Sequence, residues 1–216
     1  MMEKYYMLFR GNKIYIKSNK SRKIIEYTLN NPTTYPNVPM YYGIFNNDNI
    51  IKDLKTFIEK NLNVGSSFMK IVSGKKICLL IPDDVTEVTD IEKRAFDDFA
   101  RKLFGAKNVL LGSEFPFVAP YEENGYVCIS KTCRMMVMTY VKDKHKNVFN
   151  QKFIEAKEYT NEEIYNFINE LYGGFGSIPK IYFNGLGLSQ YSDIGIITDV
   201  MDLVNNFENA LELAKI

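Results

Sequence analysis

The chain is poor in the side chains that most often carry catalysis. Its 216 residues include no tryptophan, one histidine, His145, and three cysteines: Cys78, Cys128 and Cys133. The cysteines form neither an even disulfide framework nor a C-x-x-C pair, and each lies in or beside an apolar run. We therefore expect buried or partly buried thiols in a reducing cytoplasm, and no metal site. His145 lies in a polar turn and is expected to be a solvated loop residue.

The composition is that of an ordinary globular protein, with 46% hydrophobic and 25% charged residues. The net charge of +1 provides no global field for nucleic acid or membrane. The longest apolar stretch, residues 77–81, is far too short to span a bilayer, and the first residues lack the apolar core of a signal peptide. These features favour a cytoplasmic protein with other proteins as partners, no nucleic acid, and at most a peripheral association with the inner face of a membrane.

The hydrophobic pattern predicts an α/β domain over residues 1–120. Residues 4–29 alternate between apolar and polar around two turn segments, which predicts a three-stranded antiparallel meander. Residues 48–63 have apolar side chains at helical spacing. Residues 76–111 indicate a β-α-β unit with parallel strands. On the inner face of its helix we expect Ile91, Ala95, Phe99 and Leu103.

Residues 121–216 repeat this plan. Strands are predicted at 126–129, 135–142, 148–156 and 180–183, and helices at 160–172 and 199–215. The first of these helices begins with a capping box, Thr160 and Glu163. The second has an apolar face that consists of Val200, Leu203, Val204, Phe207, Leu211 and Leu213. The chain therefore contains an internal repeat of architecture without an obvious repeat of residues.

Four short motifs resemble the bacterial actin homologue MreB and follow one another in that family's order. They are Ile81-Pro82, TDIEKRA at 89–95, GAKNVLL at 105–111 and EFP at 114–116. Fainter similarities lie at 14–17, 29–32, 42–46, 54–58 and 181–187. The resemblance implies an actin-like fold of two ribonuclease-H-like halves. Residues 30–40 and 156–160 leave no room for the small lobes of actin, so we expect a shortened member.

The phosphate loops of that family are altered here. The family's D-L-G-T falls on Tyr6-Met7-Leu8-Phe9, and its D-I-G-G-G-T-T falls on CISKTCR at 128–134. Both metal-orienting aspartates are therefore absent, and three glycines are replaced by Ser130, Lys131 and Thr132. Side chains at these positions block the close backbone approach that glycine allows. The resemblance thus implies that ATP hydrolysis is lost. We expect that the protein is not an enzyme, binds no cofactor and has no catalytic residue.

An alternative stays open, in which the chain is a weak actin-like ATP-binding protein or ATPase with a remodelled site. Under it, Lys131 and Arg134 hold phosphate as point charges, and otherwise they are solvated side chains of a hairpin tip. Gly185 and Gly187 either keep an adenosine-side turn open or only form a tight strand-to-helix turn. Glu114 matches the family's water-activating glutamate and is catalytic only under this alternative, which also needs ATP and Mg²⁺.

The function predicted from the sequence is that of a nucleotide-independent MreB-like scaffold or adaptor in bacterial cell-shape, cytoskeletal or envelope machinery. Its partners would be proteins, including an MreB-type filament or a second copy of itself. The segment PFVAPY at 116–121 either exposes an apolar patch for such a partner or is a well-packed loop. Without the upper lobes we expect weak or no filament formation by the isolated chain.

Overall fold

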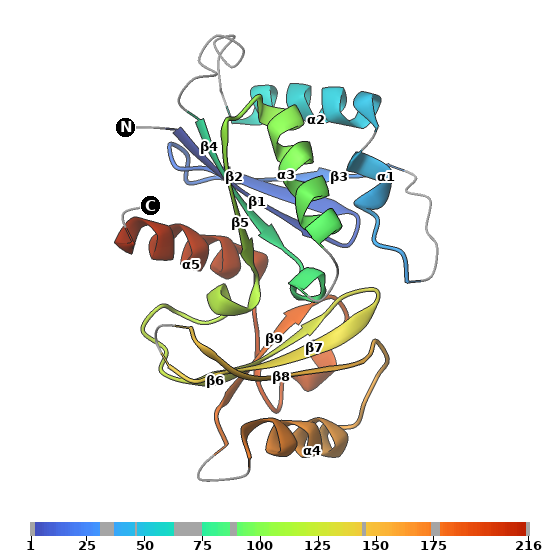
Figure 1. The fold of residues 1–216 in the computed structure, drawn as a ribbon, viewed down its shortest axis with the longest axis vertical. Helices are drawn as coiled ribbons and strands as arrows, with labels where there is room; N and C mark the ends of the chain where they lie inside the picture. The colour runs from blue at the N-terminus through green and yellow to red at the C-terminus, as the bar shows by residue number, and fades with distance from the viewer. Residues whose placement is uncertain are drawn as a thin grey trace. The chain divides into compact units, whose positions relative to one another are not determined.

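The computed structural model describes residues 3–30, 37–45, 47–62, 75–86, 90–143, 146–173 and 178–214. His145 lies outside these ranges. The chain divides into two compact units, Met1–Ser113 and Glu114–Ile216 (Figure 1). The division falls before the segment 114–120, because that segment packs within the second unit: the ring centroids of Phe117 and Phe207 are 4.7 Å apart.

The first unit is a five-stranded sheet with helices. Its elements are β1 (Glu3–Arg10), β2 (Lys13–Ser18), β3 (Ile24–Thr28), α1 (Tyr42–Phe45), α2 (Asp48–Asn61), β4 (Lys75–Ile81), the 3₁₀ turn η3 (Asp83–Thr86), α3 (Asp90–Phe104) and β5 (Asn108–Ser113). The strand order is β3-β2-β1-β4-β5. The meander β1–β3 is antiparallel, and β4 pairs in parallel with both β1 and β5, as the β-α-β pattern predicts.

Aromatic side chains fill the core of the first unit. Alternate residues of β1, namely Tyr5, Met7 and Phe9, share one buried cluster with Leu54 of α2 and Phe96 of α3. Because strand side chains alternate between faces, these three point to one side of the sheet, where α2 and α3 pack. The N-terminus of α2 is capped as its sequence suggests, since the Asn47 side chain accepts a hydrogen bond from Ile50 N.

The second unit has the same strand arrangement. Its elements are the 3₁₀ turn η4 (Phe115–Phe117), β6 (Tyr126–Lys131), β7 (Met135–Val141), β8 (Val148–Glu155), α4 (Asn161–Tyr172), β9 (Lys180–Gly185), the 3₁₀ turn η5 (Ser189–Tyr191), β10 (Ile196–Ile197) and α5 (Val200–Leu213). The order β10-β9-β6-β7-β8 matches that of the first sheet when its meander and parallel strands are aligned. The repeated architecture is therefore confirmed.

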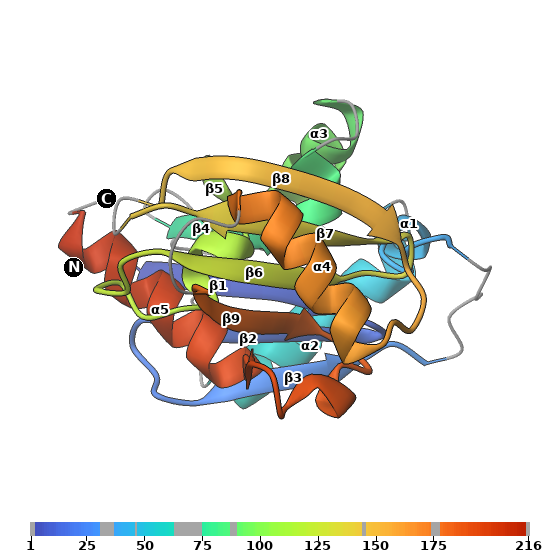
Figure 2. The ribbon, with the colours of Figure 1, turned by 90° about the horizontal axis from the view of Figure 1, so that it is seen from below.

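The two faces of the second sheet differ in polarity. Val127, Ile129 and Phe183 pack with α4 in one apolar cluster, and Figure 2 shows α4 lying across that face. The alternate residues Cys128 and Ser130 of β6 are also buried, on the opposite face. Figure 1 shows α5 on that side of the sheet. The fully buried polar side chains Ser130 and Asn184 thus lie on the face opposite α4.

The connection between β8 and α4 is short and well tied. The Tyr191 hydroxyl accepts a hydrogen bond from Tyr159 N and donates one to Tyr159 O, and both bonds are 2.9 Å long. The capping box that starts α4 is present, with Thr160 accepting from Glu163 N and the Glu163 carboxylate accepting from Thr160 N. Residues 156–160 therefore leave no place for an additional lobe at this point.

Two residues of the predicted helix faces are placed wrongly. Ile91 is 73% exposed and Leu213 is 61% exposed, although both were assigned to apolar helix faces. The buried face of α3 is centred on Phe96, Phe99 and Leu103, and Ile91 lies about 140° around the helix from Phe96 at 100° per residue. Leu213 is in the last turn of α5, beyond its last buried residue, Leu211.

The cysteines are also not all buried. Cys78 and Cys128 are buried, whereas Cys133 is exposed at the β6–β7 turn. Burial raises the pKa of the Cys78 thiol to about 11, so this thiol stays protonated and unreactive near neutral pH. Among the described residues, no helix is long and apolar enough to cross a bilayer.

Candidate functional site

A buried polar cluster lies at the end of β6 and β9 in the second unit. Asn184 Nδ2 donates to Glu114 Oε2 over 2.6 Å and lies 3.4 Å from Ser130 Oγ, which is 3.3 Å from Cys128 Sγ. All four side chains are at most 4% exposed. A buried carboxylate needs such donors, because removing it from water without hydrogen bonds is costly. Glu114 is therefore held in place by Asn184.

Two other predicted site residues are neighbours of this cluster. Lys131 pairs with Gly185 across β6 and β9, directly after the pair formed by Ser130 and Asn184. A Cβ on Gly185 would lie 2.4 Å from Lys131 O, and its φ is +133°. Glycine is thus required here by close packing of two strands as well as by conformation. The structure brings Glu114, Lys131 and Gly185 to one end of this sheet.

Gly187 differs from Gly185. Its φ is +66°, but a Cβ added there would have no atom within 4 Å. The turn after β9 therefore needs glycine at this position for its left-handed backbone and leaves open space beside it. Both ways of interpreting Gly187, as a ligand-side turn and as a simple turn, are compatible with this geometry.

The β6–β7 turn uses its own backbone N–H groups. Thr132 N donates to Met135 O over 3.0 Å, and the Thr132 hydroxyl accepts from Arg134 N at 3.2 Å and from Met135 N at 3.3 Å. An anion-binding nest requires successive N–H groups that point at the ligand. Three N–H groups here are already bonded within the turn, two of them to the Thr132 hydroxyl and one to Met135 O, so these three are not available to an anion.

In the first unit, the residues that match the family's phosphate loop lie within strand β1, before the β1–β2 turn, and are mostly apolar. Tyr6, Met7, Leu8 and Phe9 are each at most 5% exposed. The backbone of residues 5–8 pairs with β2 on one side and with β4 on the other. Neither a carboxylate nor an unused run of backbone donors is present in this stretch. The residues here therefore do not fit a phosphate group with Mg²⁺.

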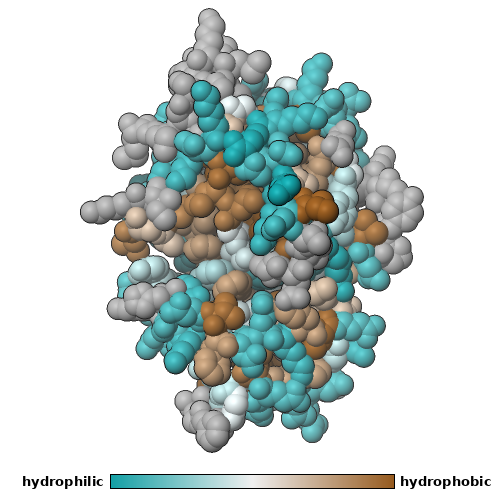
Figure 3. Space-filling view, viewed as in Figure 1, coloured by the Kyte–Doolittle hydropathy of each residue, from teal (hydrophilic) through white to brown (hydrophobic). Residues whose placement is uncertain are grey.

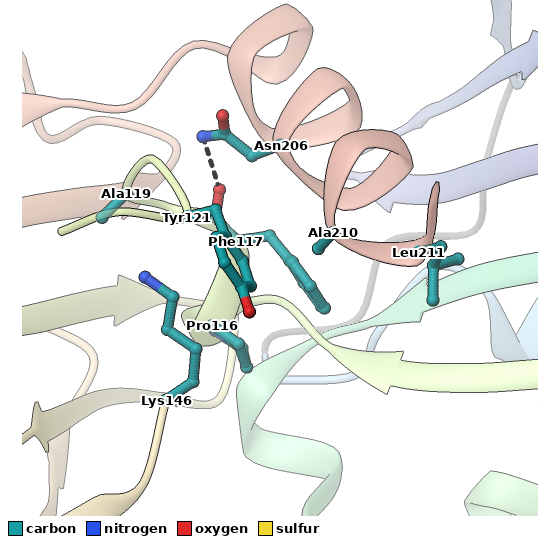
Figure 4. A pocket seen from close by; sticks show the side chains of 8 residues that line it. All are labelled: Pro116, Phe117, Ala119, Tyr121, Lys146, Asn206, Ala210 and Leu211. Carbon is teal, nitrogen blue, oxygen red and sulfur yellow. Dashed lines mark hydrogen bonds between the residues drawn. The ribbon is translucent and has the colours of Figure 1, made fainter. Parts of the chain in front are cut away.

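The segment 116–121 is packed and also lines a cavity of about 300 Å³ with α5 (Figure 4). Val118 and Ala119 are buried, and Asn206 Nδ2 of α5 donates to Phe117 O over 3.0 Å. Among the other lining residues is Lys146, whose Nζ donates to Pro120 O over 3.1 Å. The segment is therefore both a packed loop and one wall of an apolar pocket.

Lys146 has an unusual setting. Its backbone is left-handed, with φ +60°, and its Nζ lies 4.8 Å from the centroid of the Tyr126 ring. Burial lowers the pKa of its ammonium group, and Glu123 and Glu122 act in the opposite direction. The ammonium group thus replaces water by a carbonyl oxygen and an aromatic face.

The other groups around this loop form a hydrogen-bonded tie to β9. Glu123 Oε2 accepts from Lys180 Nζ at 2.8 Å and from the Tyr182 hydroxyl at 3.0 Å. The bond from Lys180 is the largest cause that lowers the pKa of Glu123. Burial, followed by the bond to Glu123, raises the pKa of Tyr182 to about 12. This network stabilises the position of the loop, and the carboxylate of Glu123 pairs with the positive charge of Lys180.

The sequence analysis missed Asn184 and Lys146 as members of these sites, and it named Thr132 only as a replacement for a phosphate-loop glycine. An asparagine at the end of an apolar strand, directly before a glycine, is a detectable signal for a polar contact at the sheet edge. Threonine has a general preference for turns. Beyond that preference, no sequence signal shows that the Thr132 hydroxyl accepts hydrogen bonds from the backbone of its own turn. Lys146 is one of three lysines in a polar stretch, and only the fold separates it from the others.

Comparison with known proteins identifies the fold. The chain matches the crystal structure of MreB 5 of Spiroplasma citri bound to AMPPNP with a TM-score of 0.59 and 10% identity, covering 100% of this chain and 97% of that one. It matches apo ParM of pSK41 with a TM-score of 0.58 and 10% identity, over 99% and 98% of the two chains. The ethanolamine utilization protein EutJ from Carboxydothermus hydrogenoformans gives 0.54 and 10% identity, over 94% and 87%.

Sequence comparison by itself finds no relative. No model of a known protein family matches the chain, and no curated protein matches it. At identities near 10%, the structural neighbours show the fold alone. The protein has the α/β fold of the actin-like proteins, two units of repeated topology, in a chain that is short for that fold.

Proposed function

We propose that the protein is a nucleotide-independent actin-like scaffold or adaptor that acts by binding other proteins, in bacterial cell-shape or envelope machinery. The observation that carries this proposal is the β6–β7 turn, where Thr132 bonds the backbone N–H groups that would otherwise face a phosphate. The turn thereby supplies its own acceptor.

The first unit supports the same proposal. Met7 and Phe9 belong to the apolar core that β1 shares with α2 and α3. The family's D-L-G-T has threonine at the position of Phe9, and that smaller side chain would open a cavity in this core. A protein that relied on ATP would need this stretch for binding, whereas here it contributes to stability.

Isothermal titration with Mg-ATP tests the proposal. We expect no saturable heat at nucleotide concentrations up to about 1 mM, which corresponds to a binding free energy weaker than about 4 kcal/mol. MreB 5 of Spiroplasma citri, whose crystal structure contains AMPPNP, is a suitable positive control. Micromolar affinity for Mg-ATP would overturn nucleotide independence.

A weak ATPase is the competing hypothesis, because Glu114, Lys131 and Gly185 lie at one end of the same sheet. It requires phosphate release above background that is abolished in Glu114→Gln. We expect no release above background from the parent or the variant. The glutamine keeps a carbonyl oxygen as acceptor for Asn184, so a loss of activity in a folded variant would identify a chemical role for the carboxylate.

A further inference from the structure

The cavity of about 300 Å³ between the segment 116–121 and α5 has a mostly apolar lining. Its apolar walls are Pro116, Phe117, Ala119, Ala210 and Leu211. Apolar surface is not confined to this cavity, since on the face drawn in Figure 3 apolar side chains gather in patches between hydrophilic ones. Apolar character alone therefore does not mark a binding site here, and the polar residues of the lining determine what the cavity can hold.

The cavity has a positive charge at one end. Among the described residues that line it, Lys146 is the only charged one, and the other polar ones are Tyr121 and Asn206. Figure 4 shows Lys146 and Leu211 on opposite sides of the cavity, with Phe117 between them. A ligand that spans the cavity therefore meets an ammonium group at one end and an aliphatic wall of α5 at the other.

The ammonium group of Lys146 is only partly satisfied by the protein. Of its three N–H donors, one reaches Pro120 O over 3.1 Å, and the centroid of the Tyr126 ring lies 4.8 Å from Nζ. Burial is the largest influence on its pKa and lowers it, and the opposing effect of Glu123 and Glu122 is smaller. These acids therefore do not fully replace the water that Lys146 has lost.

The two nearby acids do not exclude an anion from the cavity. Glu123 accepts from Lys180 Nζ at 2.8 Å and from the Tyr182 hydroxyl at 3.0 Å, so a second lysine matches its charge. Glu122 is exposed, and neither acid is among the residues that line the cavity. An anion inside the cavity therefore faces an ammonium group and no carboxylate of the described lining.

We propose that this cavity binds a small monocarboxylate with an aromatic or branched apolar group. The carboxylate accepts a hydrogen bond from Lys146 Nζ, and the pair is strengthened because both groups are partly removed from water. The apolar group packs on Phe117 and Leu211. A cationic ligand would be repelled by the ammonium group. The site lies apart from the β6–β7 turn, so it does not depend on the proposed scaffold role.

Nuclear magnetic resonance titration of the full chain with three matched ligands tests the proposal. Hydrocinnamate, its uncharged amide and phenylpropylamine share the phenyl group and differ in the polar end. At about 0.15 M salt and neutral pH, we expect hydrocinnamate to bind with a dissociation constant of about 1 mM or tighter, the amide at least about fivefold more weakly, and the amine not at all. Equal binding by the amide, or no saturable binding by hydrocinnamate, would overturn the proposal.

A pair of lysine variants tests the charged end. Lys146→Met removes the ammonium group and keeps a long apolar stem, so binding of hydrocinnamate should weaken at least about fivefold while binding of the amide stays the same. The control is Lys142→Met, which removes an exposed lysine of the same hairpin whose Nζ lies 5.7 Å from the centroid of Phe149, outside the cavity lining. It should leave both affinities unchanged. An equal loss in the two variants would refute a site at Lys146.

A pair of α5 variants tests the apolar end. Ala210→Leu fills the cavity and should abolish binding of hydrocinnamate and of its amide, whereas Asn209→Leu adds the same side chain at the adjacent exposed position and should change neither. Circular dichroism must show parental folding in both variants. Unchanged binding in folded Ala210→Leu would refute the location.

The C-terminus of another protein could present the same chemistry, an apolar side chain beside a carboxylate. A glycine-glycine-phenylalanine peptide with a free C-terminus distinguishes this source, and we expect it to bind no tighter than hydrocinnamate. Tighter binding that is lost in Lys146→Met would assign the cavity to a partner protein and overturn the small-molecule proposal. Failure of every carboxylate to bind would refute the site without touching nucleotide independence, which only the Mg-ATP titration addresses.

Discussion

The two units have the same strand order, but the residues at their first hairpins differ in kind. In the first unit, β1 fills the stretch before the turn with buried Tyr, Met, Leu and Phe side chains. In the second unit, β6 ends in Ser130 and Lys131 beside Asn184 and the buried carboxylate of Glu114. The shared topology therefore determines only where these residues lie. Whether the position serves core packing or a polar cluster depends on the side chains placed there.

The units also differ in charge. Residues 1–113 hold 18 Lys and Arg against 12 Asp and Glu, whereas residues 114–216 hold 9 against 14. The near-neutral total is thus the sum of a basic first unit, with a net charge of +6, and an acidic second unit, with a net charge of −5. The absence of a global field, inferred from the total, does not hold for the units taken separately.

We expect the largest effect from a substitution in the buried apolar stretch of β1, in the first unit. Phe9→Ala removes a buried ring whose centroid lies 5.4 Å from that of Phe96 and 5.6 Å from that of Phe99. We expect the free energy of unfolding to fall by about 3–5 kcal/mol, measured by urea denaturation. Lys131→Ala at the other hairpin should change it by less than about 0.5 kcal/mol. A small effect of Phe9→Ala would contradict a core role for this hairpin.

The next effect concerns the strand pairing that supports the polar cluster. Gly185→Ala places a Cβ 2.4 Å from Lys131 O at a φ of +133°, and should cost about 2–4 kcal/mol. Gly187→Ala, with φ +66° and no atom near the new Cβ, should cost only about 1 kcal/mol. Urea denaturation of both variants measures the difference. Equal costs would mean that close packing does not decide the residue at position 185.

The polar cluster itself is tested by Asn184→Leu. This change removes the amide that donates to Glu114 Oε2 at 2.6 Å and should cost about 1–3 kcal/mol. As a control, Asn150→Ala removes a partly buried bond of 3.0 Å to Leu171 O and should cost about 0.5–1.5 kcal/mol. If Asn184→Leu were stabilising in thermal melts, the cluster would not be a structural element of the second unit.

The smallest expected effect depends on pH. The pKa of Tyr182 is raised to about 12 in the folded state from an ordinary value of 10.0, so the folded state holds this proton more tightly. Its contribution is therefore complete below pH 10 and is lost as the pH rises toward about 12. Tyr182→Phe should cost about 1 kcal/mol at neutral pH, and the variant should lose less stability than the parent as the pH rises from 10 to about 12. Parallel pH profiles in thermal melts would exclude this assignment.

Much of the fold could be predicted from local patterns. The alternation in residues 4–29 and the apolar runs before Pro82 and Gly112 correspond to β1–β5, since strand periodicity is a local property. The capping box at Thr160 is confirmed for the same reason. The two-residue strand β10 and the short helix α1 were missed because elements of that length have no measurable periodicity.

The candidate sites could be predicted only in part. Glu114, Lys131 and Gly185 were identified by resemblance, but their meeting at one sheet end depends on the parallel pairing of β6 with β9. Asn184 stands directly before a glycine at a strand end, but this local signal does not identify Glu114 and Ser130 as its partners. These residues belong to one site because segments far apart in the sequence pack against each other.

The sequence by itself determined the repeated order of strands and helices and the absence of carboxylates and glycines from both phosphate-loop positions. These follow from residue identity and short-range periodicity, which require no knowledge of distant neighbours. Only the tertiary structure decided that Ile91 faces away from the core and that Thr132 bonds its own turn. It also decided that Gly195 lies too close to Phe183 and Ile181 of β9 to carry a Cβ. Each of these depends on atoms brought together by packing, which the order of residues specifies only through the complete fold.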